Sequence, residues 1–241
     1  MHIPLEVIDL SKFYNEREAV KNISFKINKN EIIGILGPNG CGKTTTIGMI
    51  LGLLKPSKGK VLINGIELEN QRVDLLNNLN FISPYIELPK KLTVRQNLEV
   101  YGRLYDVKNL KLKIKHLSEK LRLNDIINKI TGELSSGQKN RVALAKSLIN
   151  KPKLLFLDEP TASLDPDVGD FVREYIENYK KNNELTILLA SHNMKEVERL
   201  CSKVIMMKKG QIVDSGTCEQ LISKHGRENL EDTFLKIARS K

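Results

Sequence analysis

The sequence predicts an α/β fold with a mostly parallel core sheet, an N-terminal antiparallel β subdomain and an inserted helical subdomain. Apolar and polar residues alternate in the early segments, as at Ile23, Phe25 and Ile27, which is typical of half-buried antiparallel strands. After Gly137, helical and strand segments alternate, which indicates right-handed βαβ units and a parallel sheet. A lysine-rich stretch with helical character, residues 93–129, separates these two parts.

In the N-terminal part, the segments bounded by turn residues read in order as strands and one helix. We expect strands at 5–10, 20–27 and 31–36, a glycine-rich turn, a helix at 45–54, and a strand at 61–63. Pro56 and Gly59 are expected to end the helix. Asn64 and Gly65 after the last strand favour a tight hairpin turn.

In the C-terminal part, helices and strands are expected to alternate. We expect a helix at 137–150, a strand at 154–157, a helix at 168–180, a strand at 185–190, and a turn between short strands at 208–210. The whole chain, 1–241, is interpreted as one domain. Within it, residues from about 84 to 135 form the inserted helical lobe, and residues from about 216 to 241 form one or two surface helices.

The composition fits a soluble globular domain. The chain has 241 residues, of which 40% are hydrophobic and 28% are charged. No apolar run approaches the roughly 18 residues needed to span a bilayer. The N-terminus, MHIPLEVIDL, lacks a basic region followed by an apolar stretch. We therefore expect a cytoplasmic protein.

The net charge, the aromatic content and the cysteines limit the kinds of ligand that the chain is expected to bind. The net charge of +10 favours anionic partners, although dispersed lysines are equally consistent with a solvated surface. Tryptophan is absent and aromatic residues make up 5%, so stacking on single-stranded nucleic acid is not expected. Cys41, Cys201 and Cys218 are far apart in the sequence and form no CxxC pair, which indicates neither a disulfide framework nor a zinc site.

A phosphate-binding loop is predicted at residues 37–44, GPNGCGKT. This matches the P-loop pattern G-x-x-x-x-G-K-S/T, and it lies between an apolar strand and a helix, as that motif requires. Glycines let successive backbone N–H groups face an anion. Lys43 is then expected to reach the β- and γ-phosphates of ATP, and the Thr44 hydroxyl to coordinate Mg²⁺. Cys41 is interpreted as a small filler, with steric inhibition by a thiol reagent as a further hypothesis.

Two carboxylates end a second buried strand. The segment KLLFLDEP places Asp158 and Glu159 directly after four apolar residues. Ligands of open α/β sheets bind outside the carboxyl ends of the strands. Asp158 is therefore a candidate for the Mg²⁺ shell and Glu159 for orienting or deprotonating the attacking water, whereas without a P-loop the pair would more simply cap the next helix.

The segment LSSGQ at residues 134–138, about 20 residues before Asp158, resembles the signature motif of ATP-binding cassette (ABC) ATPases, usually LSGGQ. The following sequence, KNRVALAKSLINKPKLLFLDEPTASLD, strengthens the likeness, whereas Ser-Ser-Gly alone could be an ordinary helix N-cap. The resemblance to the nucleotide-binding domain of ABC transporters covers about residues 5–216. It implies ATP hydrolysis at two sites between two head-to-tail chains, with a homodimer expected and a heterodimer left open.

The resemblance also implies residue roles. Tyr14 would stack on adenine, His192 would contact the γ-phosphate, and the D-loop at 163–165, including Asp165, would cross the dimer interface. The implied nucleotide-binding residues are Tyr14, Gly37, Pro38, Asn39, Gly40, Cys41, Gly42, Lys43, Thr44 and Thr45. The implied contacts to the nucleotide of the partner subunit are Ser135, Ser136, Gly137, Gln138 and Asp165. Catalysis would rest on Glu159, His192 and Lys43, and the metal ligands would be Thr44 and Asp158.

One position departs from the family pattern. Most members carry a glutamine at the end of the strand before the helical lobe, and the equivalent position here is Pro84, or Ser83 if the register slips by one. Proline has no side-chain ligand for a metal. A water, Ser83 or Tyr85 could substitute, and the departure bears on coupling more than on ATP binding.

Three classes of function follow from the resemblance. The first is the motor subunit of a transporter, at the inner face of the cell membrane, whose membrane-spanning permease is a separate chain. The C-terminal NLEDTFLKIA resembles the tail of exporter ATPases, as an amphipathic helix also would. The second class is a non-transport ABC ATPase for iron–sulfur assembly or cell division. The third is nucleic-acid maintenance or translation control, against which the chain has no coiled coil and no second cassette. The transported substrate and its direction are set largely by the membrane partner.

Overall fold

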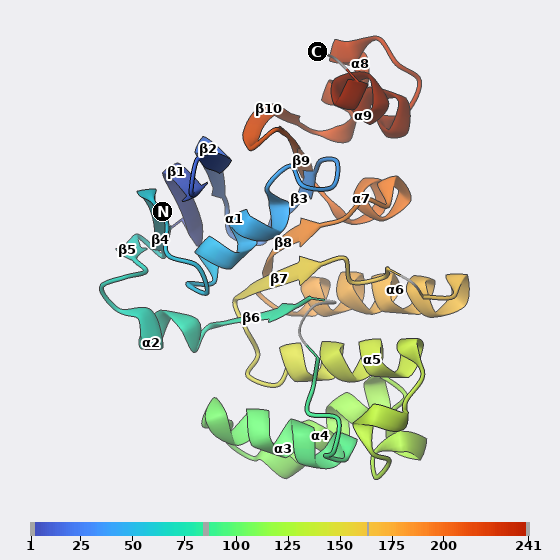
Figure 1. Cartoon of the computed structure of the whole chain (residues 1–241). Coiled ribbons are helices and arrows are strands. Elements are labelled where there is room, and N and C mark those ends of the chain that lie inside the picture. Colours follow the sequence, from blue (N-terminus) through green and yellow to red (C-terminus); the bar gives the residue numbers. More distant parts are fainter. Residues whose placement is uncertain (1–2, 84–86, 163, 240–241) are drawn as a thin grey trace. The chain divides into compact units, whose positions relative to one another are not determined.

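The structure is a computed structural model, and it describes residues 3–83, 87–162 and 164–239. Contacts divide the chain into two units, which can be followed along the sequence colours of Figure 1. The first unit comprises Met1–Leu76 and Asn183–Lys241, and the second comprises Asn77–Asn182. Pro84, Tyr85 and Ser163 lie outside the described residues.

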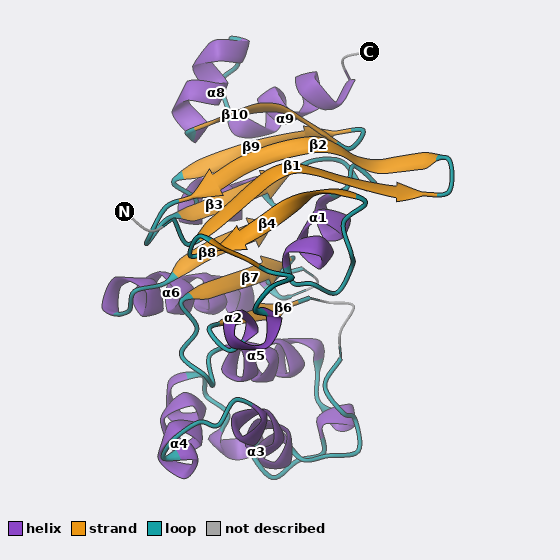
Figure 2. Ribbon diagram, turned by 90° about the vertical axis from the view of Figure 1, so that its left-hand side faces the viewer, coloured by secondary structure: helices purple, strands orange, loops and turns teal. Residues whose placement is uncertain are grey.

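An antiparallel sheet occupies the N-terminal part of the first unit, as predicted. Its strands are β1 (Leu5–Tyr14), β2 (Arg17–Ile27), β4 (Lys58–Ile63) and β5 (Ile66–Glu67), in the order β2-β1-β4-β5. Figure 2 shows β2, β1 and β4 side by side. Asn64 and Gly65, with φ of 52° and 80°, make the tight turn between β4 and β5. β1 runs beyond the predicted 5–10, because register shifts after Val7 keep its polar half paired with β2.

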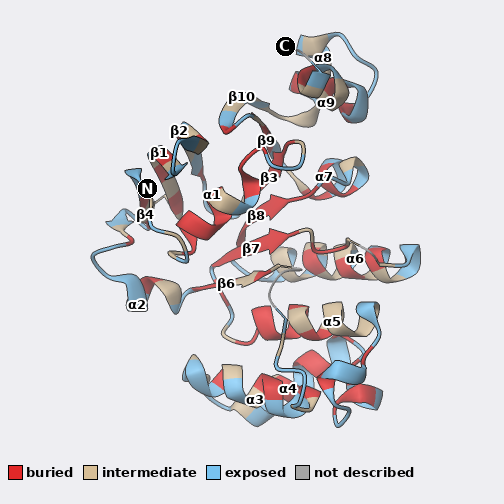
Figure 3. Ribbon diagram, in the orientation of Figure 1, coloured by how far each residue is buried: buried red, intermediate tan, exposed pale blue. Residues whose placement is uncertain are grey.

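A second group of strands in this unit is mainly parallel. β3 (Ile32–Leu36) pairs in parallel with both β8 (Thr186–Ala190) and β9 (Lys203–Lys208), and β10 (Gln211–Gly216) returns antiparallel to β9. All residues of β3 and β8 are buried, as the red strands of Figure 3 show. Near-continuous apolar runs are what parallel strands covered on both faces require.

The helix after the glycine-rich loop, α1, spans Lys43–Ile50, so the predicted bounds of 45–54 were wrong at both ends. It begins at Lys43 because Gly42, with φ 109°, serves as its N-cap. It ends early because Gly52 takes φ 66°, a left-handed conformation that closes helices. The apolar run continues past the end because the Leu54 side chain packs against Gly48. Two short helices, α2 (Arg72–Leu76) and α7 (Met194–Leu200), complete the connections.

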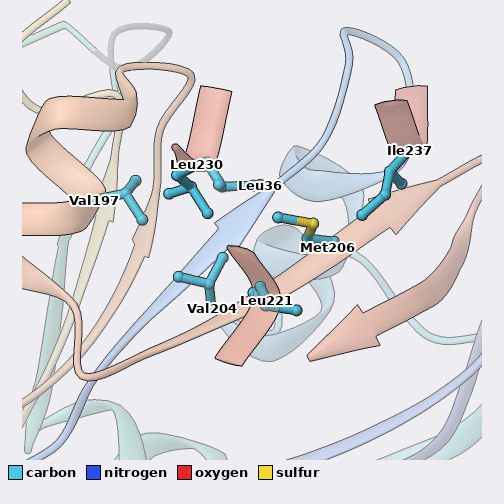
Figure 4. Packing of buried hydrophobic residues seen from close by; sticks show 7 residues of the cluster. All are labelled: Leu36, Val197, Val204, Met206, Leu221, Leu230 and Ile237. Atoms are coloured by element: carbon cyan, nitrogen blue, oxygen red, sulfur yellow. The ribbon is translucent and has the colours of Figure 1, made fainter. Parts of the chain in front are cut away.

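Two helices at the C-terminal end, α8 (Cys218–His225) and α9 (Leu230–Arg239), confirm the predicted helical tail. They pack on the parallel strands through one apolar cluster, shown in Figure 4, formed by Leu36, Val197, Val204, Met206, Leu221, Leu230 and Ile237. Asp214 of β10 binds α8 as well, because His225 Nε2 and Lys224 Nζ each lie 2.7 Å from its carboxylate. Cys201 and Cys218 pack against the cluster as free thiols.

The second unit combines one parallel strand pair with helices. β6 (Leu79–Ile82) pairs in parallel with β7 (Leu154–Asp158). Helices α3 (Val94–Leu104) and α4 (Leu110–Lys120) and the short 3-10 helices Asn124–Ile126 and Thr131–Glu133 lie between β6 and α5 (Ser136–Ser147), and α6 (Pro166–Asn182) follows β7. The lysine-rich stretch is therefore helical, as predicted. α5 ends before the predicted Asn150, and α6 extends beyond the predicted 168–180 at both ends.

Among the described residues, no helix is both long and apolar enough to cross a membrane.

Candidate functional site

The glycine-rich loop turns back on itself between β3 and α1. Cys41 N donates to Pro38 O at 3.2 Å, and Gly210 N donates to Cys41 O at 3.0 Å. A Cβ on Gly37 would lie 2.3 Å from Cys41 Sγ and 2.5 Å from Met207 O, and one on Gly42 would lie 2.7 Å from Ala19 O. Only glycine therefore fits at both positions, since real Cβ atoms do not approach other atoms this closely.

Lys43 crosses this loop with its ammonium group buried. Its side chain is part of a residue only 8% exposed, and Nζ donates to Gly37 O at 2.6 Å and to Pro38 O at 3.4 Å. Among the residues that the structure describes, no side chain caps α1 or α4, whereas side chains cap α3, α5, α7 and α8. The positive end of α1 is thus left for an anion, and the exposed Thr44 and half-buried Thr45 lie in its first turn.

Cys41 is buried within the loop, with 2% exposure. Burial raises the pKa of its thiol, and this outweighs the opposing effect of the nearby Lys43 ammonium. A neutral, buried thiol reacts slowly with alkylating reagents, which favours the filler interpretation of Cys41 over a ready target for thiol reagents. The other loop residues, Pro38, Asn39 and Gly40, are half-buried or exposed at its outer edge.

Tyr14 ends β1 with 45% of its surface exposed. The Lys12 ammonium lies 5.3 Å from the centre of its ring, a cation–π distance that orients the ring at the surface. An exposed aromatic face of this kind can accept a flat ligand.

His192 lies in a loop fixed on both sides. Ser191, before it, is buried and donates from Oγ to Glu196 Oε2 at 2.6 Å. Asn193, after it, caps α7 by accepting from Glu196 N, and its own N–H donates to Ser191 Oγ. The exposed imidazole therefore sits at the carboxyl end of β8 on a backbone that its neighbours hold.

Asp158 and Glu159 end β7 in the second unit. Asp158 is 3% exposed and accepts a hydrogen bond from Ser83 Oγ at 3.2 Å. Ser83 follows β6 and is the position that would replace the family's glutamine if the register slips by one. Its hydroxyl therefore lies at Asp158, the candidate metal ligand. Glu159 is half-buried and adopts a left-handed backbone, with φ 51°.

The signature segment forms the start of α5. Ser135 is the N-cap, with its Oγ accepting from Gln138 N and its N–H donating to Gln138 Oε1, a reciprocal capping box. A Cβ on Gly137 would lie 3.3 Å from Val168, so this glycine lets α5 approach α6 closely. The geometry is compatible with both interpretations of the segment, an ordinary helix N-cap and a binding site for an anion. The cap occupies one N–H group of the first turn, and the others can still face an anion.

The second unit brings several candidate residues to one pocket. Ser136 of α5, Glu159 after β7, Leu164 in the next loop and Ser83 line it together. Asp165 is exposed and begins the turn into α6 through the bond from Gly169 N to its carbonyl. Polar contacts of α5 were missed from the sequence, among them Asn140 to Pro160 and Lys146 to Phe81. An asparagine inside a helix is a weak signal for the first.

A glycine-rich loop between a buried parallel strand and a helix, together with a second buried strand ending in two carboxylates, defines the class: a P-loop NTPase.

Comparison with known proteins identifies a family within this class. Residues 20–162 match the family described as ABC transporter. ABC transporter ATP-binding protein NatA of Bacillus subtilis is 34% identical over 238 residues, which cover 96% of each chain. Nod factor export ATP-binding protein I of Rhizobium etli is 35% identical over 222 residues, 91% of this chain and 70% of that protein. A solved structure of an ATP-binding subunit of an ABC transporter matches with TM-score 0.90 and 26% identity, over 98% of this chain and 99% of the other.

The chain belongs to the ABC transporter family, as an ATP-binding cassette ATPase. The predicted family, the P-loop α/β fold class and the predicted ATPase are thereby confirmed.

Proposed function

We propose that this chain is the motor subunit of a membrane transporter, and that it acts from the cytoplasmic face through a separate permease and a second ATPase chain. The observation that carries the proposal is the match to NatA along 96% of both chains, since that relative is named an ABC transporter ATP-binding protein. The match to a Nod factor export protein favours export as the direction.

ATP is proposed to bind along the glycine-rich loop. When ATP binds, the Lys43 ammonium group donates to phosphate oxygens in place of Gly37 O and Pro38 O. The exchange is favourable because a hydrogen bond between two charged groups is stronger than one to a neutral carbonyl. The backbone N–H groups of Gly40 and of residues 42–45 face the phosphates beside the uncapped start of α1, whereas the Cys41 N–H donates to Pro38 O within the loop. Tyr14 stacks on the adenine, and its exposed ring leaves one face open for that contact.

Mg²⁺ fits the polar groups proposed to face the γ-phosphate. Thr44 offers a hydroxyl and Asp158 a buried carboxylate, and hard oxygen ligands are the ones that this ion prefers. When bound, Mg²⁺ neutralises charge on the transferring phosphoryl group. Ser83 holds Asp158 in place through its hydroxyl, which supplies a side chain where Pro84 has none to offer.

Hydrolysis converts ATP and water to ADP and phosphate. Glu159 orients the water and accepts its proton, and His192 contacts the γ-phosphate from its fixed loop. Ser135, Ser136, Gly137 and Gln138 at the start of α5 contact the nucleotide of the partner subunit, with Asp165 beside them. A complete site then needs two chains, so ATP drives their closure and hydrolysis reopens them.

The test is a pull-down of the tagged chain from detergent-solubilised membranes of the native host, with ATP and the Glu159→Gln substitution to hold the closed state. The proposal expects a polytopic membrane protein at stoichiometric yield, and less of it with Lys43→Ala. Recovery of soluble proteins only, with the tagged chain absent from the membrane fraction, would overturn the transporter role in favour of a non-transport ABC ATPase.

A further inference from the structure

Helix α5 contacts three other segments of its unit through long polar side chains. Asn140 Nδ2 donates to Pro160 O at 2.6 Å, Arg141 donates to Arg122 O at 2.7 Å, and Lys146 Nζ donates to Phe81 O at 3.1 Å. The first of these bonds reaches the segment that follows β7, one residue after Glu159. It therefore joins the signature helix to the loop that carries the proposed catalytic carboxylate.

The Asn140 amide has one orientation available. Pro160 has no N–H, so its carbonyl is the only backbone group that it offers. An oxygen turned toward that carbonyl would place two acceptors against each other, so the nitrogen must face it. Among the described residues, the amide oxygen of Asn140 is buried without a hydrogen-bond partner. The Asn140 side chain thus makes the bond from Nδ2 to Pro160 O while its Oδ1 accepts none from the part of the chain that the structure describes.

Glu159 needs such an anchor because its backbone is unfavourable. Its φ of 51° lies in the left-handed region, which costs most residues other than glycine, asparagine and aspartate. A proline follows it, and that restricts its backbone further toward extended conformations. The turn closes through Ala162 N donating to Glu159 O at 3.1 Å. Unusual backbone conformations of this kind persist only where neighbouring contacts hold them.

We propose that Asn140 is a positioning residue for hydrolysis: its amide holds the 159–162 turn so that the Glu159 carboxylate points at the attacking water. The inference rests on the proposed role of Glu159 as the residue that orients and deprotonates water. Asn140 lines the same pocket as Glu159, and its proposed effect on hydrolysis is exerted through its hydrogen bond to the turn.

The matched substitutions are Asn140→Asp and Asn97→Asp. Asparagine and aspartate have the same shape, but the substitution replaces the donor by an acceptor. Asn97 is the control, although it is fully buried and Asn140 is half-buried. Its Nδ2 also donates to backbone, to Pro89 O at 3.1 Å and Thr93 O at 3.2 Å, as well as to Thr131 Oγ1 at 2.8 Å. Its Oδ1, like that of Asn140, has no hydrogen-bond partner among the described residues. Asn97 lies in α3, and none of these three acceptors belongs to the 159–162 turn.

The measurements are kcat and KM for ATP in the full chain, together with the thermal midpoint. Asn140→Asp is expected to lower kcat by about 10- to 100-fold, because small displacements of a catalytic group have effects of this size, with KM nearly unchanged. Asn97→Asp is expected to lower the midpoint but to keep kcat at temperatures below it. If Asn140→Asp fails to fold, Asn140→Ala decides, since it removes the donor without adding repulsion. Wild-type kcat in the folded variant would overturn the proposal.

A double substitution separates this proposal from the proposed function. If Asn140 acts through Glu159, then Asn140→Asp adds no further loss of kcat to a Glu159→Gln chain. Additive losses would contradict the positioning role while leaving Glu159 intact as the base. Wild-type turnover in Glu159→Gln alone would instead refute the role of Glu159, and with it the basis for assigning Asn140.

Discussion

At the scale of single residues, Lys146 is a buried lysine with no acidic partner among the residues that the structure describes. It is 8% exposed, and its ammonium group donates to Asn80 Oδ1 and Phe81 O and lies 4.5 Å from the Phe81 ring and 5.2 Å from the Tyr101 ring. Burial lowers its pKa from 10.5 to about 8. The neutral amine is therefore favoured in the folded state relative to the unfolded one.

This depressed pKa predicts a pH dependence of stability. Between about pH 8 and pH 10.5 the folded chain binds fewer protons at Lys146 than the unfolded chain does, so the free energy of unfolding rises with pH. From pH 7.5 to 9.5 we expect a rise on the order of 2 kcal/mol that Lys146→Met lacks. Denaturant unfolding of both chains at each pH measures it, and other titrating groups cancel in the comparison. Parallel curves for the two chains would contradict the prediction.

Residues with a sequence pattern were predictable, and residues that act through long-range contacts were not. The spacing of Gly37, Gly42 and Lys43 in one short segment is enough to indicate the loop. Asn140 and Pro160, by contrast, are 20 positions apart, and no local pattern says that one will meet the other. The left-handed backbone of Glu159 is likewise a property of the folded turn.

At the scale of elements, three helices begin with the same reciprocal cap. Thr93 with Gln96, Ser135 with Gln138 and Thr217 with Gln220 each form a capping box, at α3, α5 and α8. Only the box at α5 lies in the signature segment. The other two therefore show what this cap contributes to stability alone.

The three caps separate a structural role of Ser135 from its proposed role at the partner's nucleotide. Thr93→Ala, Ser135→Ala and Thr217→Ala should each lower the free energy of unfolding by about 1 kcal/mol. Only Ser135→Ala should also lower kcat, because only that serine is proposed to contact ATP. Unfolding curves and ATPase rates for the three chains measure both effects. An equal loss of kcat in all three, or none in Ser135→Ala, would leave Ser135 as an N-cap only.

Element types were predictable from periodicity, whereas several boundaries depended on the fold. Buried runs such as Leu154 to Leu157 identify strands directly. The end of α1 was misplaced because the apolar run through Leu54 reflects packing on Gly48, not helical continuation. β6 is short, and its pairing with the distant β7 rather than its composition defines it. β5 has only two residues, and its pairing with β4 across the Asn64-Gly65 turn defines it.

At the scale of the molecule, the residues proposed to serve one ATP come from separate stretches of the chain. The glycine-rich loop and His192 belong to the first unit, and Asp158, Glu159 and the signature segment belong to the second. The signature segment is proposed to contact the partner's nucleotide, so that a single chain holds no complete site. ATP is therefore expected to close two chains together, and hydrolysis to separate them.

The most direct test is the mass of the Glu159→Gln chain in solution, by size-exclusion chromatography with light scattering, with and without ATP and Mg²⁺. We expect a monomer without ATP, a dimer with ATP, and loss of that dimer when Ser135→Ala or Lys43→Ala is added. The wild-type chain is expected to dimerise only transiently, because it hydrolyses the nucleotide. A Glu159→Gln chain that binds ATP and stays monomeric, or one that turns over at the wild-type rate, would contradict these expectations.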